Sequence, residues 1–165
     1  MKNTITIERL RELLAYEPAT GILRWRVVRG AGRPGRIAGS VNEIGRVIVR
    51  IDRKQFKAHI LAWALYYGAW PSQEIDHRDR NPQNNKIRNL RLSTRSQNTC
   101  NQGLLARNTT GFKGVSYHKR RRRYVARIAL HGKPMHLGYF TTAKAAHAAY
   151  SAAAKELHGE FACVA

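Results

Sequence analysis

One segment near the middle of the chain constrains the fold more than any other. Asp76 and His77 are adjacent, an asparagine-rich stretch follows them, and Asn98 closes the segment. The first two side chains would point to opposite sides of a regular strand, but a twist or bulge there could aim both toward one cleft. A loop and a helix carrying Asn98 would then bring an amide to the same place as the carboxylate and the imidazole. The segment therefore predicts a strand, a loop and a helix whose polar side chains converge.

These three groups match the requirements for hydrolysing a phosphodiester bond. A carboxylate oxygen and an amide oxygen are ligands that one Mg²⁺ or Mn²⁺ ion accepts. Such an ion stabilises charge on the phosphate, and a neighbouring imidazole can deprotonate water. Zinc is disfavoured, because the segment holds a single histidine and no thiolate. The competing interpretation is that Asp76 and His77 form a salt-bridged surface pair, since such dipeptides are common by chance.

Several short motifs make residues 20–100 similar to the HNH (ββα-metal) endonucleases of phages and mobile introns. They are Glu-Ile-Asp-His at 74–77, Asn-Asn at 84–85, Asn-Leu-Arg at 89–91 and Ser-Gln-Asn at 96–98. The resemblance implies that Asp76 and Asn98 ligate the metal ion and that His77 activates the attacking water.

The residues around these three groups have supporting interpretations. Asparagine amides bond nearby backbone groups and fix loops, so Asn84 and Asn85 are interpreted as structural residues of the loop. Asn85 is the better candidate for a clamp that holds the loop against the helix. Arg78 and Arg80 flank the base and are predicted to contact phosphates, with ordinary solvated charge as the alternative. His59, at a helix start, is interpreted as structural.

The charge of the chain indicates a polyanionic partner. Thirty Lys and Arg residues stand against ten Asp and Glu, which gives a formal net charge of +20. Nucleic acid is the favoured partner, because phosphate neutralisation supplies most non-specific binding energy. An anionic membrane surface is disfavoured, because no long basic amphipathic helix is evident and the longest apolar run, 60–70, is about half a membrane span. We therefore expect a monomer that binds double-stranded DNA in the cytoplasm of a bacterial host, with no membrane association and no small-molecule cofactor.

The pattern of apolar residues, glycines and prolines predicts an α+β chain of two domains. The first domain, residues 1–105, is expected to contain a helix over 6–16, a strand over 21–27, a basic hairpin from 45–51 and 55–59, and a helix over 59–67. A polar linker is expected over 101–110. The second domain, residues 106–165, is expected to contain strands at 111–117, 124–130 and 135–140 and an alanine-rich helix over 143–157.

The second domain resembles AP2 DNA-binding domains over residues 111–162. The resemblance rests on Gly-Val at 114–115, Leu-Gly-Tyr-Phe at 137–140 and Ala-Ala-His-Ala-Ala-Tyr at 145–150. It implies a three-stranded antiparallel sheet with one packed helix, whose exposed face lies in the major groove of DNA. The side chains that it places near DNA are Lys113, Ser116, His118, Arg123, Arg127 and His136.

The run of four arginines has its own interpretation. Its charge predicts phosphate contacts without sequence information, and a solubilising turn is the alternative. The run consists of Arg120, Arg121, Arg122 and Arg123. Tyr139, nearby in the expected sheet, is interpreted as a core or rim residue.

Together these patterns predict a metal-dependent HNH DNA endonuclease that an AP2 domain targets, of the phage or mobile-element homing type. The main alternative is a non-catalytic, sequence-specific DNA-binding regulator whose HNH motif is a relic. A binder of RNA or another polyanion is a third possibility, disfavoured because no exposed aromatic platform motif is evident.

Overall fold

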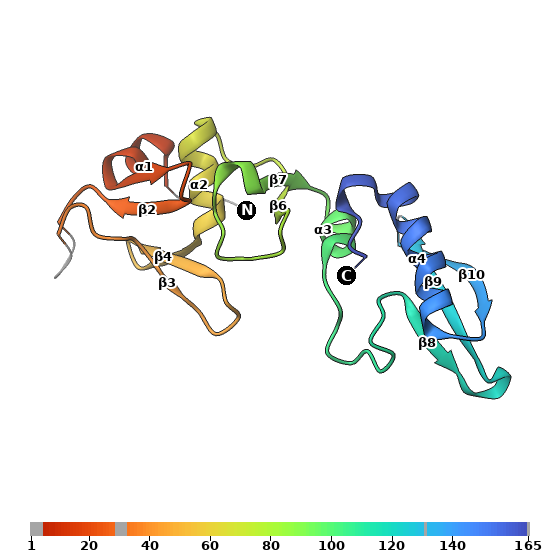
Figure 1. Cartoon of the computed structure of the whole chain (residues 1–165). Coiled ribbons are helices and arrows are strands. Elements are labelled where there is room, and N and C mark those ends of the chain that lie inside the picture. Colours follow the sequence, from red (N-terminus) through yellow and green to blue (C-terminus); the bar gives the residue numbers. More distant parts are fainter. Residues whose placement is uncertain (1–4, 29–32, 131, 165) are drawn as a thin grey trace. The chain divides into compact units, whose positions relative to one another are not determined.

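The chain divides into two compact units. A computed structural model of the chain describes residues 5–28, 33–130 and 132–164. The first unit is Met1–Ser93 and the second is Thr94–Ala165. Both combine helices with small antiparallel sheets, so the expected mixed α+β class is confirmed (Figure 1).

The first unit contains short elements that follow one another closely. In chain order they are α1 (Ile7–Leu13), β1 (Leu14–Glu17), β2 (Ile22–Trp25), β3 (Ser40–Val41), β4 (Val47–Ile51), β5 (Lys54–Lys57), α2 (Ala58–Tyr67), β6 (Glu74–His77), the 3₁₀ helix η1 (Ile87–Asn89) and β7 (Leu90–Ser93). Hairpins join β1 to β2, β4 to β5, and β6 to β7, and β3 pairs with β4.

The first helix ends earlier than the sequence predicts. The expected helix covers 6–16, but α1 ends at Leu13 and the next four residues form β1. Leu14 is buried in the core and pairs with Trp25 across the hairpin, so its apolar side chain serves a strand rather than another helical turn. The turn into β2 uses Gly21, whose φ of +80° is a left-handed value that favours glycine.

Two apolar clusters hold the first unit together. The larger one joins α1, α2 and the sheets, and its buried members include Leu10, Leu23, Val49, Ile51 and Leu61. The smaller one packs Ala62 of α2 against Ile75 of β6 and Leu90 of β7. Helix α2 ends at Gly68, in the left-handed conformation. The smaller cluster therefore fixes the β6–β7 hairpin, which carries Asp76 and His77.

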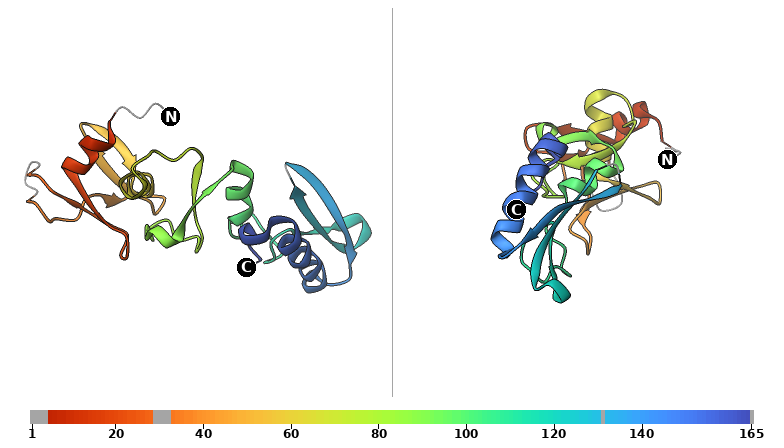
Figure 2. Two further views of the ribbon diagram at one scale, coloured as in Figure 1. Left: turned by 90° about the horizontal axis from the view of Figure 1, so that it is seen from above. Right: turned by 90° about the vertical axis from the view of Figure 1, so that its right-hand side faces the viewer.

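The second unit is a sheet with one long helix packed on it. Its elements are α3 (Arg95–Asn101), β8 (Val115–His118), the 3₁₀ helix η2 (Lys119–Arg121), β9 (Arg123–Leu130), β10 (Lys133–Phe140), α4 (Ala143–His158) and the 3₁₀ helix η3 (Gly159–Phe161). The strands are antiparallel in the order β10-β9-β8, and α4 covers one face of the sheet (Figure 2).

Small side chains let α4 lie close to the sheet. Ala146 and Ala154 of α4 are fully buried against Ala126 and Ile128 of β9. A side chain at Gly114 would meet the ring of Tyr150, so the chain lies close against α4 just before β8. The alanine-rich sequence of the predicted helix thus has a packing reason.

The second unit begins before the predicted linker at 101–110. Helix α3 contacts η3, and the Nζ of Lys113 donates a hydrogen bond to the carbonyl of Cys100 at 2.6 Å. These contacts attach α3 to the sheet-containing part of the chain. Within the described ranges, no helix is long and apolar enough to cross a membrane.

Candidate active site

Asp76 and His77 are consecutive residues of β6, and both side chains are buried. The Nε2 of His77 lies 3.1 Å from the Oδ1 of Asn85. An amide oxygen only accepts hydrogen bonds, so Nε2 carries the proton in this pair. A neutral ring protonated at Nε2 has its basic lone pair on Nδ1, the nitrogen that can accept a proton from water.

Asn85 is held by residues far away in the sequence. Its backbone carbonyl accepts a hydrogen bond from the hydroxyl of Tyr16 in β1 at 2.7 Å. The N–H of Ile87 donates to the carbonyl of Pro18 at 3.2 Å, and a Cβ on Gly21 would lie 2.6 Å from the carbonyl carbon of Asn85. The β1–β2 hairpin therefore supports the loop between β6 and β7 and fixes the position of Asn85, whose side-chain amide contacts His77.

Burial keeps both histidines of this region neutral at pH 7. The rings of His59 and His77 meet edge to face, with centroids 5.0 Å apart. Burial, followed by the nearby His77, lowers the pKa of His59 to about 3. Burial also lowers the pKa of His77, although the hydrogen bond to Asn85 and the charge of Asp79 oppose this shift. A neutral His77 is in the protonation state that a general base requires.

The loop after β6 is braced by an acidic side chain that the sequence reasoning missed. The carboxylate of Asp79 accepts hydrogen bonds from the side-chain amides of Asn84 at 2.6 Å and Asn89 at 2.9 Å. It also accepts one from the backbone N–H of Asn81 at 2.8 Å. Burial raises the pKa of Asp79, but these hydrogen bonds outweigh it and leave that pKa below its usual value. The crowding of Asn and Asp over 79–89 was the signal for this network.

The carboxylate of Asp76 already has a cationic partner. Its Oδ2 accepts a hydrogen bond from the Nε of Arg91 at 2.8 Å, and the second guanidinium nitrogen lies 2.7 Å away. The register of the hairpin pairs the same two residues. A divalent cation bound at Asp76 would therefore share this carboxylate with Arg91.

The donor types expected at the metal suit Mg²⁺ or Mn²⁺, which take carboxylate and amide oxygens and keep several waters. Asp76 belongs to the first unit, whereas Asn98 lies on α3 in the second. Helix α3 starts with a capping box in which Thr94 and Gln97 exchange hydrogen bonds. Among residues 5–28, 33–130 and 132–164, no group of three or more His, Cys, Asp or Glu side chains could hold a metal ion.

Arg78 and Arg80 follow β6 directly, and both are exposed. The backbone N–H of Arg78 donates to the carbonyl of Asn89 at 2.9 Å, and that of Arg80 donates to the carbonyl of His77 at 2.9 Å. The loop backbone is thus fixed, and two exposed arginines follow the candidate base closely in the chain.

In the second unit, most of the predicted DNA-contacting residues share the sheet face opposite α4. The register aligns Ser116 with Val125, His118 with Arg123, and His136 with Arg127. The alternate residues of β9, including Ala126 and Ile128, face α4. Ser116, Arg123, Arg127 and His136 are exposed and His118 is partly exposed, so this outer face is polar and cationic.

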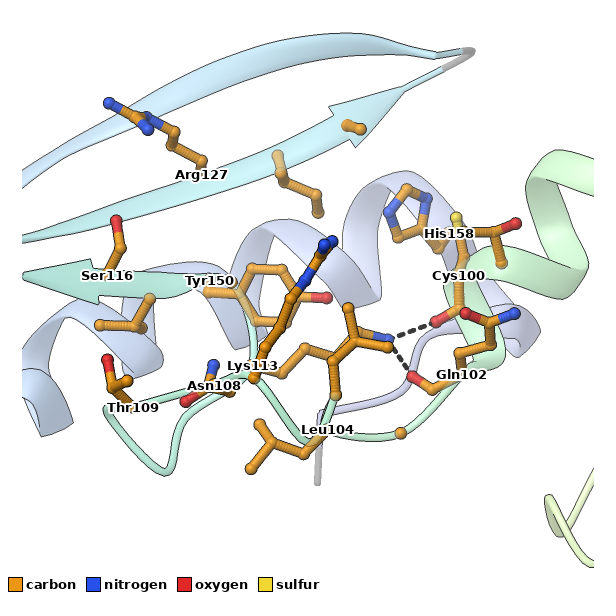
Figure 3. Close-up of a pocket in the computed structure, with 18 residues that line it drawn as sticks. Cys100, Gln102, Leu104, Asn108, Thr109, Lys113, Ser116, Arg127, Tyr150 and His158 are labelled. Carbon is orange, nitrogen blue, oxygen red and sulfur yellow. Dashed lines mark hydrogen bonds between the residues drawn. The ribbon is translucent and has the colours of Figure 1, made fainter.

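Lys113, which the AP2 resemblance places near DNA, is bound to the end of helix α3. Its Nζ donates hydrogen bonds to the carbonyls of Cys100 and Gln102 at the end of α3, as the dashed lines in Figure 3 show. An ammonium group at a helix C-terminus is favourable, because the last carbonyls lack intrahelical donors. Lys113 also lines a cavity of about 490 Å³ together with Tyr150 and His158. In this structure it is a helix-capping residue.

Comparison with known proteins adds a relative and a family. The chain is 33% identical over 119 residues to Protein 3.8 of Escherichia phage T7, an alignment that covers 69% of this chain and 98% of that protein. The family of HNH endonucleases matches residues 56–100, which include β6, the loop, β7 and most of α3. The chain is thus related to this phage protein, and its residues 56–100 belong to the HNH endonuclease family. Membership implies DNA as the substrate class, and HNH nucleases generally use a divalent metal ion.

Proposed function

We propose that this HNH protein is a metal-dependent DNA endonuclease of the phage or mobile-element homing type, acting in the cytoplasm of a bacterial host. One observation carries the proposal: the buried imidazole of His77, whose pKa is lowered by burial, is held through Nε2 by Asn85 and directly follows Asp76 in the chain. This arrangement presents a base of defined tautomer beside a potential metal ligand.

The side chains have separate roles in this proposal. Nδ1 of His77 takes a proton from the attacking water, and Asn85 keeps the ring in the orientation and tautomer that allow it. Asp76 and Asn98 would hold one Mg²⁺ or Mn²⁺ ion, which when bound stabilises charge on the phosphate and the departing oxygen. Arg78 and Arg80 hold phosphate oxygens beside the base.

The second unit supplies the targeting in this proposal. Its three-stranded sheet with one packed helix, and a polar, cationic outer face, fit an AP2-like module that lies in the major groove of duplex DNA. The net charge of +20 supports capture of DNA before any base is read.

The ion pair between Asp76 and Arg91 favours one alternative function. Arg91 already neutralises the carboxylate proposed as a metal ligand. A protein in which this ion pair has replaced the metal would be a DNA-binding regulator with a relic nuclease motif.

Plasmid nicking distinguishes the two functions. Wild-type protein should convert supercoiled plasmid to open-circular or linear DNA only when Mg²⁺ or Mn²⁺ is present. The His77→Ala variant should lose this activity by about 10²-fold or more, since a general base contributes about 10²–10⁴-fold. The variant should still retard DNA in a gel, which shows that the loss of cleavage is not a loss of DNA binding. Retardation by the wild type without cleavage, over several divalent ions, would establish the regulator instead.

A further inference from the structure

One arginine of the run 120–123 differs from its neighbours in its position. The guanidinium carbon of Arg121 lies 4.6 Å from the centroid of the Tyr139 ring. Tyr139 pairs with Val125 in the register and is 39% exposed, so its ring is accessible on the outer face of the sheet. The imidazole of His136 packs against the same ring, with centroids 4.7 Å apart. Arg121 therefore lies over the face predicted to meet DNA.

His118 holds Arg121 in this position. The backbone N–H of Arg121 donates a hydrogen bond to the Nδ1 of His118 at 3.2 Å, so the imidazole caps the short helix η2. Arg122 then adopts a left-handed conformation with φ of 49° and returns the chain to β9. The ring of His118 also meets Tyr139 edge to face, with centroids 5.8 Å apart. His118 precedes η2 and Arg121 ends it, and both contact Tyr139, so the turn is held against the sheet.

A guanidinium group stacked on an aromatic ring is suited to reading a base. The ring restrains the plane of the group while its edge keeps N–H donors in a rigid fork. In the major groove that fork matches the O6 and N7 acceptors of guanine, and such a pair discriminates against a wrong base by about tenfold to a hundredfold. An arginine without this restraint contributes mainly charge to the phosphates.

We infer that Arg121 is a base-reading residue of the second unit, which recognises a guanine in duplex DNA, and that His118 is its positioning residue. The inference rests on the proposed DNA targeting by this unit and assigns part of its specificity. The inference gives Arg121 a different role from Arg120, although both are exposed residues of the same turn.

Selection from a random duplex library tests the inference without a known target. The full-length wild-type chain is used with EDTA, so that no cleavage occurs, and the bound duplexes are sequenced. The wild type should enrich a motif that contains guanine. Arg121→Ala and Arg121→Lys should lose preference at one guanine position by about tenfold to a hundredfold while other positions stay unchanged. Arg120→Ala should weaken binding to all duplexes alike and make the salt dependence less steep.

Two variants of His118 test its positioning role. In His118→Asn the amide oxygen occupies the place of Nδ1 and can still accept the N–H of Arg121. In His118→Gln the amide reaches the place of Nε2 instead, and the cap is lost. The guanine preference should therefore survive in His118→Asn and be lost in His118→Gln, a difference that general damage to the sheet would not produce.

Three results would overturn the inference. They are equal effects of Arg120→Ala and Arg121→Ala on all duplexes, an enriched motif that the Arg121 variants leave intact, and binding with no base preference at all. Plasmid nicking by the wild type is measured separately, so failure of the nuclease proposal and failure of this inference give different results.

Discussion

At the scale of single residues, the candidate site contains two buried histidines that are neutral at neutral pH. The rings of His59 and His77 meet edge to face, and burial disfavours the protonated form of each. The same burial that prepares His77 as a base makes the fold sensitive to acid, because both histidines take up protons on unfolding.

The stability of the first unit should therefore fall as the pH is lowered. His59 has a pKa of about 3 when folded and about 6.5 when unfolded. The unfolded chain binds more protons between these values, so His59 contributes stability that is complete above about pH 6.5 and is lost as the pH falls toward 3. Between these pH values, His59 changes the free energy of unfolding by up to about 1.4 kcal/mol per pH unit. Urea unfolding at several pH values gives the free energy of unfolding as a function of pH. This free energy should depend less steeply on pH in His59→Phe than in the wild type, and an equal dependence would contradict the prediction.

At the scale of elements, the turn between β1 and β2 supports the active-site loop. Gly21 packs directly against the backbone of Asn85 and Lys86, and the hydroxyl of Tyr16 binds the carbonyl of Asn85. The hairpin thus acts on His77 through Asn85, although it contributes no group to the proposed chemistry.

Two glycines with the same backbone conformation allow this support to be tested. Gly21 has φ of +80° and a Cβ there would lie 2.5 Å from the nitrogen of Lys86. Gly35 has φ of +85°, and a Cβ there would meet no atom of the described residues within 4 Å. Both alanine variants carry the left-handed penalty of about 1–2 kcal/mol. Only Gly21→Ala must also displace the loop, so it should be less stable than Gly35→Ala and should nick plasmid more slowly. Equal nicking by the two variants would show that the hairpin does not position the site.

At the scale of the whole molecule, the compact second unit includes α3. The ammonium of Lys113 caps this helix, and α3 also contacts η3 near the end of the chain. The helix that carries Asn98 thus belongs structurally to the unit with the proposed DNA-reading sheet.

Two fragments test this grouping. Residues 94–165 should unfold cooperatively and bind duplex DNA, with log K falling by about 0.9 per unit of log salt for each phosphate contacted. Residues 106–165 lack α3, so the ammonium of Lys113 loses two acceptors, each worth about 1.5–3 kcal/mol when the donor is charged. The shorter fragment should therefore melt at a lower temperature. Equal melting temperatures would place the boundary after α3, where the sequence predicts it.

Patterns that act over a few residues were predictable. The hairpin of β4 and β5, helix α2, the strands β8–β10 and helix α4 follow from alternation, glycine stops and the alanine-rich run. Leu13 and Leu14 are both apolar, so local periodicity did not separate the end of α1 from the start of β1. The contact of Tyr16 with Asn85 spans 69 residues and has no local signal.

The sequence alone determined which chemical groups are available: an adjacent carboxylate and imidazole, asparagines after them, and an excess of positive charge that favours DNA. The tertiary structure decided their states. Burial beside His59 sets the protonation of His77, the loop seated by Gly21 sets its tautomer through Asn85, and the hairpin register gives Asp76 its partner Arg91. The reason is physical: protonation, tautomer and ion pairing depend on desolvation and on neighbours that only the folded chain brings together.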